Sequence, residues 1–175
     1  MRKTETVAPH SFMKSLFAGV LPAHMVFPYP RQGKEARETL GLVLESFRSW
    51  ARERLDGGAI DHAAVFPEAQ VRELKDLGIF GLTVPEEYGG AGLSITSYCR
   101  LMEEMCHHFA AIATIVGAHL GIGSKGIVLY GNDGQKKRWL PAVAKGDLLA
   151  AYALTEAEAG SDAGSQKSRA VWDAQ

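Results

Sequence analysis

The residues best suited to chemistry lie near the end of the 175-residue chain, in the stretch 152–165, which reads YALTEAEAGSDAGS. It follows sequence typical of helices and opens with an apolar piece that has no helical spacing. It then combines hydroxyl groups, which donate hydrogen bonds, with glycines, which let the backbone approach a ligand. These residues are Thr155, Gly160, Ser161, Gly164 and Ser165. Such a loop suits a planar or phosphorylated cofactor, although composition alone favours a linker between two domains.

Helices must position this loop, because apolar residues recur at intervals of three and four along most of the preceding chain. One predicted helix runs from Lys34 and ends at Asp56, Gly57 and Gly58. Others begin at Pro67, at Ser94 and at Gln135, and a sharp glycine-rich connection spans 82–93. A strand is indicated only at 168–172. The pattern therefore predicts an all-α bundle.

Composition narrows the possible partners. The net charge of -1 and the pI of about 6.6 give no electrostatic reason to expect a nucleic-acid partner or an anionic membrane surface. The apolar runs are interrupted before the length of a membrane span, so no transmembrane segment is expected. Cys99 and Cys106 lie seven residues apart, on one helix face, and are expected to be reduced core residues.

The first part of the chain is expected to form an arm. Residues 11–21 have the spacing of a short amphipathic helix, and Pro22, Pro28 and Pro30 prevent it from continuing. Glu5 and the lack of arginine between Arg2 and Arg31 argue against a cleaved organellar leader. We therefore expect a cytoplasmic protein with a retained N terminus.

Residues 110–130 are rich in alanine and carry four glycines within predicted helix: Gly117, Gly121, Gly123 and Gly126. Each costs up to about 1 kcal/mol relative to alanine, so close approach of another helix or of a bound chain is the expected reason. The last three also match G-x-G-x-x-G, with Asp147 about twenty residues further on. A dinucleotide-binding fold is disfavoured because no further strand–helix–strand units follow.

Two other clusters of titratable residues are not expected to do chemistry. Glu86 and Glu87 are adjacent in a loop, so their side chains point in different directions. His107 and His108 lack the spacing of four residues that a helical metal site needs, and no metal is expected.

The spacing of the loop also carries a family resemblance. The ordered string Ala153-Leu154-Thr155-Glu156, two residues, Ala159-Gly160-Ser161-Asp162, two residues, Ser165 resembles the signature of the acyl-CoA dehydrogenase family. Two segments agree with that family, 77–94 (LGIFGLTVPEEYGGAGLS) and 131–147 (GNDGQKKRWLPAVAKGD), and 11–30 is similar to the leading arm of its very-long-chain branch. The resemblance implies an N-terminal arm at 1–32, the family's N-terminal helical domain at 33–148, and the truncated start of its middle β-domain at 149–175.

The resemblance implies a role in removing a proton from C2 of a fatty acyl thioester and passing a hydride from C3 to the flavin of FAD, in β-oxidation. It assigns cofactor contacts to Tyr152, Ala153, Leu154, Thr155, Gly160 and Ser161. It assigns substrate contacts to Ser161 and, along the acyl channel, to Thr114, Gly117 and Ala118, whose small size implies long acyl chains. In the complete family member the partners are acyl-CoA, electron-transfer flavoprotein and further copies in a homo-oligomer.

The resemblance also shows what this stretch lacks. The family's catalytic base is a glutamate from a later domain, so no catalytic residue is assigned; Glu156 is expected to brace the loop and Asp162 to accept its N–H groups. Ala157 and Glu158 stand where proline usually follows the Thr-Glu pair. The chain alone is therefore expected to be inactive. The alternatives are a non-catalytic all-α interaction domain and an incomplete gene product.

Overall fold

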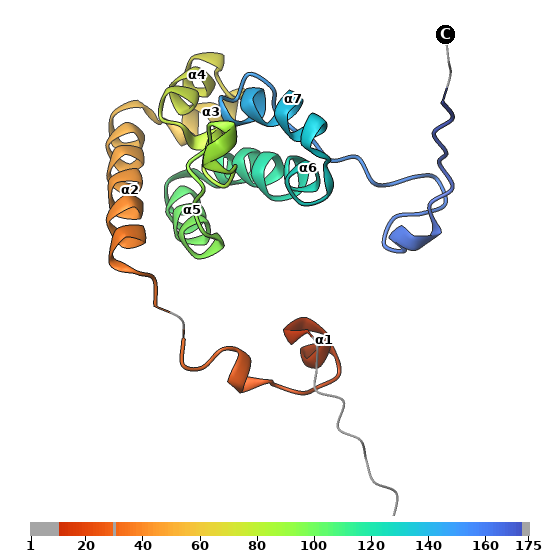
Figure 1. Cartoon of the computed structure of the whole chain (residues 1–175). Coiled ribbons are helices and arrows are strands. Elements are labelled where there is room, and N and C mark those ends of the chain that lie inside the picture. Colours follow the sequence, from red (N-terminus) through yellow and green to blue (C-terminus); the bar gives the residue numbers. More distant parts are fainter. Residues whose placement is uncertain (1–10, 30, 173–175) are drawn as a thin grey trace, which may run out of the picture. The chain divides into compact units, whose positions relative to one another are not determined.

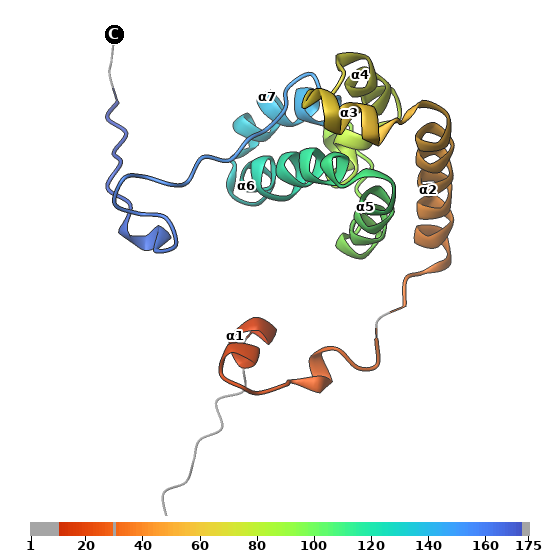
Figure 2. The same cartoon turned by 180° about the vertical axis from the view of Figure 1, so that it is seen from behind.

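A computed structural model describes residues 11–29 and 31–172, and it divides the chain into two units, Met1–Glu35 and Ala36–Gln175. No strand occurs in the described residues, as the all-α prediction requires. Figures 1 and 2 show α-helices joined by short turns. The predicted domain boundaries at residues 32 and 148 stay predictions.

The first unit contains α1 (Phe12–Phe17) and the 3-10 turn η1 (Ala23–Met25). The Ser11 side chain caps α1 by accepting a hydrogen bond from the Lys14 N–H. Most of the large apolar side chains described in this unit are exposed: Met13, Leu16, Phe17, Val20, Leu21, Met25, Phe27 and Tyr29. The predicted short helix is present, and Pro30 lies outside the described residues.

The second unit is built from α2 (Lys34–Arg54), which begins just before it, α3 (Gly57–Ala63), α4 (Glu68–Asp76), α5 (Ile95–Gly117), α6 (Lys125–Tyr130) and α7 (Asp133–Ala144). A π-helix, η4 (Ala118–Gly123), joins α5 to α6. Two 3-10 turns, η2 (Ile79–Gly81) and η3 (Glu86–Tyr88), lie in the connection before α5, and a third, η5 (Ala163–Ser165), lies near the C-terminus. Phe109 has an extended backbone conformation and divides α5 into two arms, visible in Figure 1.

One hydrophobic core holds these helices together. Its fully buried side chains come from α2, α4, the η2 turn and the loop after it, α5, the π-helix and α7: Phe47, Leu74, Ile79, Phe80, Val84, Leu101, Met105, Ile112, Val116, Leu120 and Leu140. Burial of apolar surface at this density is the main favourable term in folding. The core lies around the second arm of α5, which packs in the middle of the bundle.

The predicted helix starts at Pro67, Ser94 and Gln135 hold to within two residues. Pro67 precedes α4, the Ser94 hydroxyl accepts the Ser97 N–H, and Asn132 and Gln135 form a capping box at the start of α7. Gly78 has φ of +71°, the left-handed conformation expected after α4. Local capping chemistry therefore specifies these helix ends.

The first helix ends at Arg54, two residues before Asp56, as predicted, but a further helix that was not predicted begins at Gly57. Asp56 caps a new helix there, because its carboxylate accepts the Ala59 N–H at 3.0 Å. Gly57 is needed by packing instead, since a Cβ at this position would lie 2.9 Å from Cδ2 of Phe109.

The prediction that Cys99 and Cys106 are core residues is also wrong, because both are exposed free thiols. The buried stripe of the first arm of α5 runs through Ser97, Leu101 and Met105, and the cysteines lie outside it.

The alternative of a dinucleotide-binding fold is wrong as well. Ile112 and Val116 lie inside α5 as buried helical residues, so no strand precedes the glycines at 121, 123 and 126. The predicted strand at 168–172 does not form either, and residues 166–172 have no regular structure. A lone strand has no partner for its ladder hydrogen bonds.

The helical stretch Ile95–Tyr130 passes as a candidate membrane span by length and composition, with a mean hydropathy of 1.5 and 33% of the apolar window buried. By length and hydropathy, the prediction that the apolar runs are too short for a transmembrane helix is therefore wrong. A core helix passes the same test, and this one contributes Leu101, Ile112 and Val116 to the core. We interpret it as the central helix of the bundle.

Candidate functional site

The stretch singled out by its hydroxyls and glycines forms a loop rather than a continuation of the bundle helices. Residues 150–162 contain no helix, and the short η5 turn follows at Ala163–Ser165. Figure 1 shows this segment in blue. The loop closes on itself where the Glu156 N–H donates to the Ala159 carbonyl at 2.7 Å, which brings Thr155 next to Gly160.

Glu156 braces the loop. Its carboxylate accepts the backbone N–H groups of Lys167 at 2.8 Å and Ser168 at 3.2 Å. Hydrogen bonding from the Ser168 side chain and from these N–H groups holds the pKa of Glu156 below its usual value. The expected bracing role is therefore present, and it stabilises the ionised form of the side chain.

The hydrogen-bond partner of the Asp162 carboxylate differs from the prediction that it accepts backbone N–H groups of the loop. Its carboxylate accepts the Ser165 hydroxyl at 2.5 Å, while the Ser165 N–H donates to the Asp162 backbone carbonyl at 3.0 Å. The side chain therefore holds a hydroxyl of the η5 turn and not the backbone N–H groups of the loop.

The first part of the loop presents unused donors. Within the described chain, the N–H groups of residues 152–155 and 160–161 donate to no protein acceptor. Tyr152, Ala153, Thr155 and Ser161 are exposed, and Leu154 and Gly160 are partly buried. Backbone and hydroxyl donors in this arrangement can hold a ligand rich in acceptors, such as the phosphates and the ring carbonyls of a dinucleotide cofactor.

Of the proposed substrate residues, Thr114 and Gly117 lie on the second arm of α5, Ala118 begins the π-helix and Ser161 lies in the loop, and the structure does not bring them into one pocket. Thr114 is exposed, donates its hydroxyl to the Ala110 carbonyl, and lines an apolar pocket of about 390 Å³ with Phe66 and Phe109. Gly117 and Ala118 are partly buried and do not line that pocket.

Gly117 and Gly121 both face Tyr98, on the first arm of α5. A Cβ at Gly117 would lie 3.3 Å from Cε of Met102 and 3.9 Å from the Tyr98 hydroxyl, and one at Gly121 would lie 3.8 Å from that hydroxyl. Sequence reasoning missed Tyr98 and Met102 as neighbours of these glycines. The spacing of four residues places them on one helix face, but only the bend at Phe109 shows which residues that face meets.

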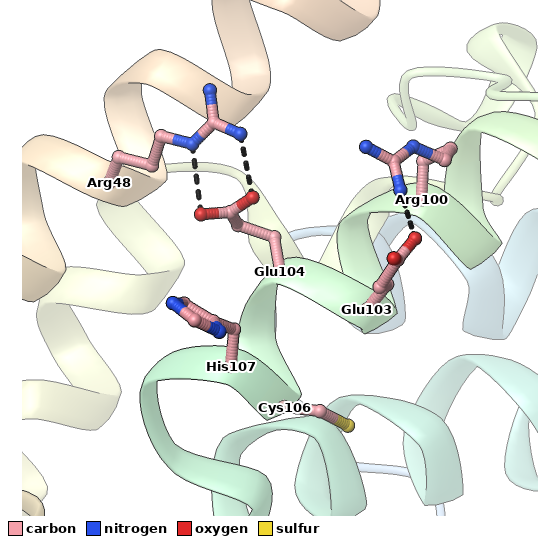
Figure 3. Close-up of a pocket in the computed structure, with 6 residues that line it drawn as sticks. All are labelled: Arg48, Arg100, Glu103, Glu104, Cys106 and His107. Atoms are coloured by element: carbon pink, nitrogen blue, oxygen red, sulfur yellow. Dashed lines mark hydrogen bonds and ion pairs between the residues drawn. The ribbon is translucent and has the colours of Figure 1, made fainter.

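Another pocket, of about 570 Å³, lies elsewhere, between α2 and the first arm of α5. Figure 3 shows the Arg48 guanidinium binding Glu104 in a bidentate pair, with N···O distances of 2.8 and 2.7 Å, and Arg100 paired with Glu103 on the same helix. The hydrogen bond from Arg48 lowers the pKa of Glu104 to about 2. The Arg48–Glu104 pair joins α2 to α5, and Cys106 and His107 line the same pocket.

Comparison with known proteins agrees with the helical arrangement. Residues 37–147 match the family model described as acyl-CoA dehydrogenase, N-terminal domain. A relative from Macaca fascicularis, a very long-chain specific acyl-CoA dehydrogenase of mitochondria, is 42% identical over 162 residues, which are 92% of this chain and 25% of the relative. The chain thus spans about a quarter of the length of that curated relative.

Solved structures are similar over the same region. An acyl-CoA dehydrogenase from Bacillus anthracis, complexed with FAD, matches with a TM-score of 0.60 and 37% identity, over 78% of this chain and 23% of that one. A structure described as an electron transferring flavoprotein of Acidaminococcus fermentans matches with a TM-score of 0.69 and 25% identity, over 82% of this chain and 37% of that one. The chain belongs to the acyl-CoA dehydrogenase family, and it corresponds to that family's N-terminal helical domain with the loop that follows.

Proposed function

We propose that this chain forms the helical wall and the cofactor loop of a flavin-dependent acyl-CoA dehydrogenase that acts on long-chain fatty acyl-CoA in β-oxidation. The observation that carries the proposal is the loop at 152–161, whose N–H donors have no protein acceptor in the described chain. The family match ends at residue 147, shortly before this loop begins, which supports the proposal.

The hydrogen-bond donors of the loop are of the type that FAD, with its ring and phosphate acceptors, requires. The N–H groups of 152–155 and the Thr155 hydroxyl would hold the isoalloxazine ring, and the N–H groups at Gly160 and Ser161 would approach the phosphates. When bound, FAD accepts the hydride that leaves C3 of the acyl thioester. The part of this chain is to orient the ring and to place hydrogen-bond donors where negative charge develops on it. Ser161 would also contact the pantetheine arm of the substrate.

We also propose that the isolated chain neither binds FAD tightly nor turns over substrate. The loop is exposed, and its three carboxylates are already engaged: Glu156 with backbone N–H groups, Glu158 with the Lys167 ammonium and Asp162 with Ser165. No carboxylate on the loop is therefore available as a base for the C2 proton. Flavin absorbance of the purified chain and dye-linked oxidation of palmitoyl-CoA test this, with no signal expected in either; a yellow, active chain would contradict it.

The positive test needs the rest of an enzyme. Residues 36–165 can replace the matching segment of the Bacillus anthracis acyl-CoA dehydrogenase, whose structure contains FAD. We expect this hybrid enzyme to retain FAD and to oxidise long-chain acyl-CoA. A hybrid that folds, as judged by circular dichroism, but contains no flavin would refute the proposed function.

We propose that the small residues Thr114, Gly117 and Ala118 line the acyl channel and leave room for long acyl chains. In the hybrid enzyme Gly117→Phe should lower the ratio of kcat/KM for palmitoyl-CoA to that for butyryl-CoA by about tenfold or more, because the ring would fill space beside Met102 and Tyr98. Gly126→Phe is the matched control, since a Cβ at Gly126 meets nothing within 4 Å. An unchanged ratio in Gly117→Phe would remove these residues from the acyl channel.

The remaining partners follow from the same proposal. Acyl-CoA is the substrate, an electron-transfer flavoprotein is the electron acceptor, and further copies form a homo-oligomer. A cytoplasmic location is proposed from Glu5 and the sparse arginines of the first thirty residues. Fractionation of cells that express the tagged chain tests the location.

A further inference from the structure

His119 is a buried histidine that the proposed chemistry does not use. It lies in the π-helix, its side chain is 1% exposed, and its ring packs edge-on against Phe80 with centroids 5.3 Å apart. π-Helical turns inside α-helices often occur at functional sites. Burying an imidazole among apolar side chains is unfavourable unless both ring nitrogens have partners.

Both ring nitrogens of His119 have partners. Nε2 lies 3.1 Å from the carbonyl oxygen of Phe80 and 3.2 Å from that of Val143, and the Ala150 N–H donates to Nδ1 at 3.0 Å. Because carbonyl oxygens only accept, Nε2 must carry the proton and Nδ1 must be the acceptor. One neutral tautomer therefore satisfies every contact of the ring.

These contacts join parts of the chain that are far apart in sequence. Phe80 belongs to the η2 turn, Val143 to the last turn of α7, and Ala150 to the start of the candidate cofactor loop. Ala150 lies outside any helix and has no backbone acceptor in the described chain, so its N–H is held by His119. The histidine thus connects the bundle to the loop.

Gly123 supplies a second, independent contact. It lies four residues after His119, and a Cβ there would lie 2.7 Å from Cβ of Ala150 and 2.8 Å from the Ala150 carbonyl carbon and oxygen. Only glycine lets the Ala150 backbone lie this close to the helix. Gly126, three residues further on, has open space around it.

We propose that His119 and Gly123 form a docking site for Ala150, and that His119 is a positioning residue that fixes where the cofactor loop leaves the bundle. The proposal rests on the proposed function, because the purpose of fixing the loop is to aim its N–H donors at FAD. Ala150 is two residues from Tyr152, so an error in its position passes directly to the donors. Burial of the ring lowers the pKa of His119, which keeps Nδ1 available as an acceptor near neutral pH.

Two substitutions of His119 separate its two hydrogen-bonding roles. In His119→Asn the amide oxygen can take the place of Nδ1 and keep the acceptor for Ala150, whereas the donor to Phe80 and Val143 is lost. In His119→Gln the longer amide can keep that donor and lose the acceptor. Gly123→Ala leaves the histidine intact and pushes Ala150 away, and Gly126→Ala is its control.

The experiment measures amide hydrogen exchange by NMR on the 175-residue chain, without flavin. We expect the Ala150 amide to be protected relative to the exposed Ala157 amide. His119→Gln and Gly123→Ala should speed exchange at Ala150 by about tenfold or more, with the core amide of Leu101 unchanged. His119→Asn and Gly126→Ala should keep the protection. An unprotected Ala150 in the unsubstituted chain, or equal losses in the Asn and Gln variants, would overturn the docking site.

The same substitutions in the hybrid enzyme test positioning. His119→Gln and Gly123→Ala should lower retained FAD several-fold at unchanged unfolding temperature, and His119→Asn and Gly126→Ala should not. Full FAD retention in His119→Gln, with Ala150 released, overturns the positioning role alone. A parent hybrid without FAD overturns the proposed function, and the exchange data on the free chain are independent of that result.

Discussion

Two glycine-rich loops in this protein use their glycines in opposite ways. In the loop at 81–93, a Cβ at Gly90 would overlap the carbonyl oxygens of Val84 and Gly81, and a Cβ at Gly81 would lie 2.8 Å from the Ala144 carbonyl oxygen. In the loop at 152–165, a Cβ at Gly160 or Gly164 would make only ordinary contacts, at 3.6 and 3.5 Å.

The two loops also differ in what holds them. The first is closed by backbone hydrogen bonds: the N–H groups of Ala91, Gly92 and Leu93 donate to the carbonyls of Gly81, Val84 and Leu82. The second is held by the carboxylates of Glu156 and Asp162, and its first N–H groups have no acceptor in the described chain. In the second loop, packing does not require the glycines, and the nearby backbone N–H groups have no acceptor in the described chain. A loop that binds a ligand needs both features.

The largest effect is expected in the first loop. Gly90→Ala should lower the free energy of unfolding by about 2 to 3 kcal/mol, because the new methyl group meets backbone that cannot move aside. Gly89→Ala is the matched control: its φ is +84° but its surroundings are open, so a loss of about 1 kcal/mol is expected. Urea denaturation followed by circular dichroism measures both. Equal losses would mean that backbone conformation, and not the close contact, makes these glycines necessary.

An intermediate effect is expected from acid in the second loop. The pKa of Glu156 is lowered in the folded chain from the usual value of 4.5. The stabilisation that the ionised carboxylate gives to the folded loop is therefore complete above pH 4.5 and is lost as the pH falls through the folded pKa. Amide exchange at Lys167 and Ser168 should therefore increase below about pH 4.5, after correction for the intrinsic pH dependence of exchange. Glu156→Gln should show the increase already at pH 7. The backbone-closed loop at 81–93 should not respond over the same range, and a parallel response there would point to unfolding of the bundle.

The smallest effect on stability is expected for Gly160→Ala. Its surroundings are open and its φ is not in the left-handed region, so the free energy of unfolding should change by less than about 0.5 kcal/mol. In the hybrid enzyme the same substitution should lower the retained FAD, because the methyl group would stand where the phosphates approach. Gly164→Ala, equally open, serves as the comparison for stability. A marked loss of stability in Gly160→Ala would assign that glycine to the fold.

Local chemistry in the sequence was sufficient for most helix starts and ends. Ser94, Pro67 and Gly78 act through their own side chains or φ angles, within a few residues of the helix end that they define. Gly57 correctly marked the end of α2, but the sequence did not show that α3 begins there or that a tertiary neighbour requires the glycine. The neighbour is Phe109, more than fifty residues away in the chain. The prediction that Cys99 and Cys106 are core residues was wrong because the apolar pattern of a helix does not show which of its faces packs against the core.

In the candidate site, too, features set by neighbouring residues could be predicted from the sequence and features set by tertiary contacts could not. The family resemblance of 152–165 predicted a cofactor loop, and the bracing role of Glu156 was expected because the family's catalytic base lies in a later domain. The role of His119 could not be predicted, because one histidine among apolar residues has no periodic or spacing signal. Its partners Phe80, Val143 and Ala150 come together only in the folded bundle.

The sequence by itself determined the all-α class, the helix caps and the chemical character of the loop after Leu154, because each depends on residues near one another in the chain. Only the tertiary structure decided which glycines are required by packing, which cysteines are exposed and how Ala150 is held. These depend on distances between segments that no local pattern encodes.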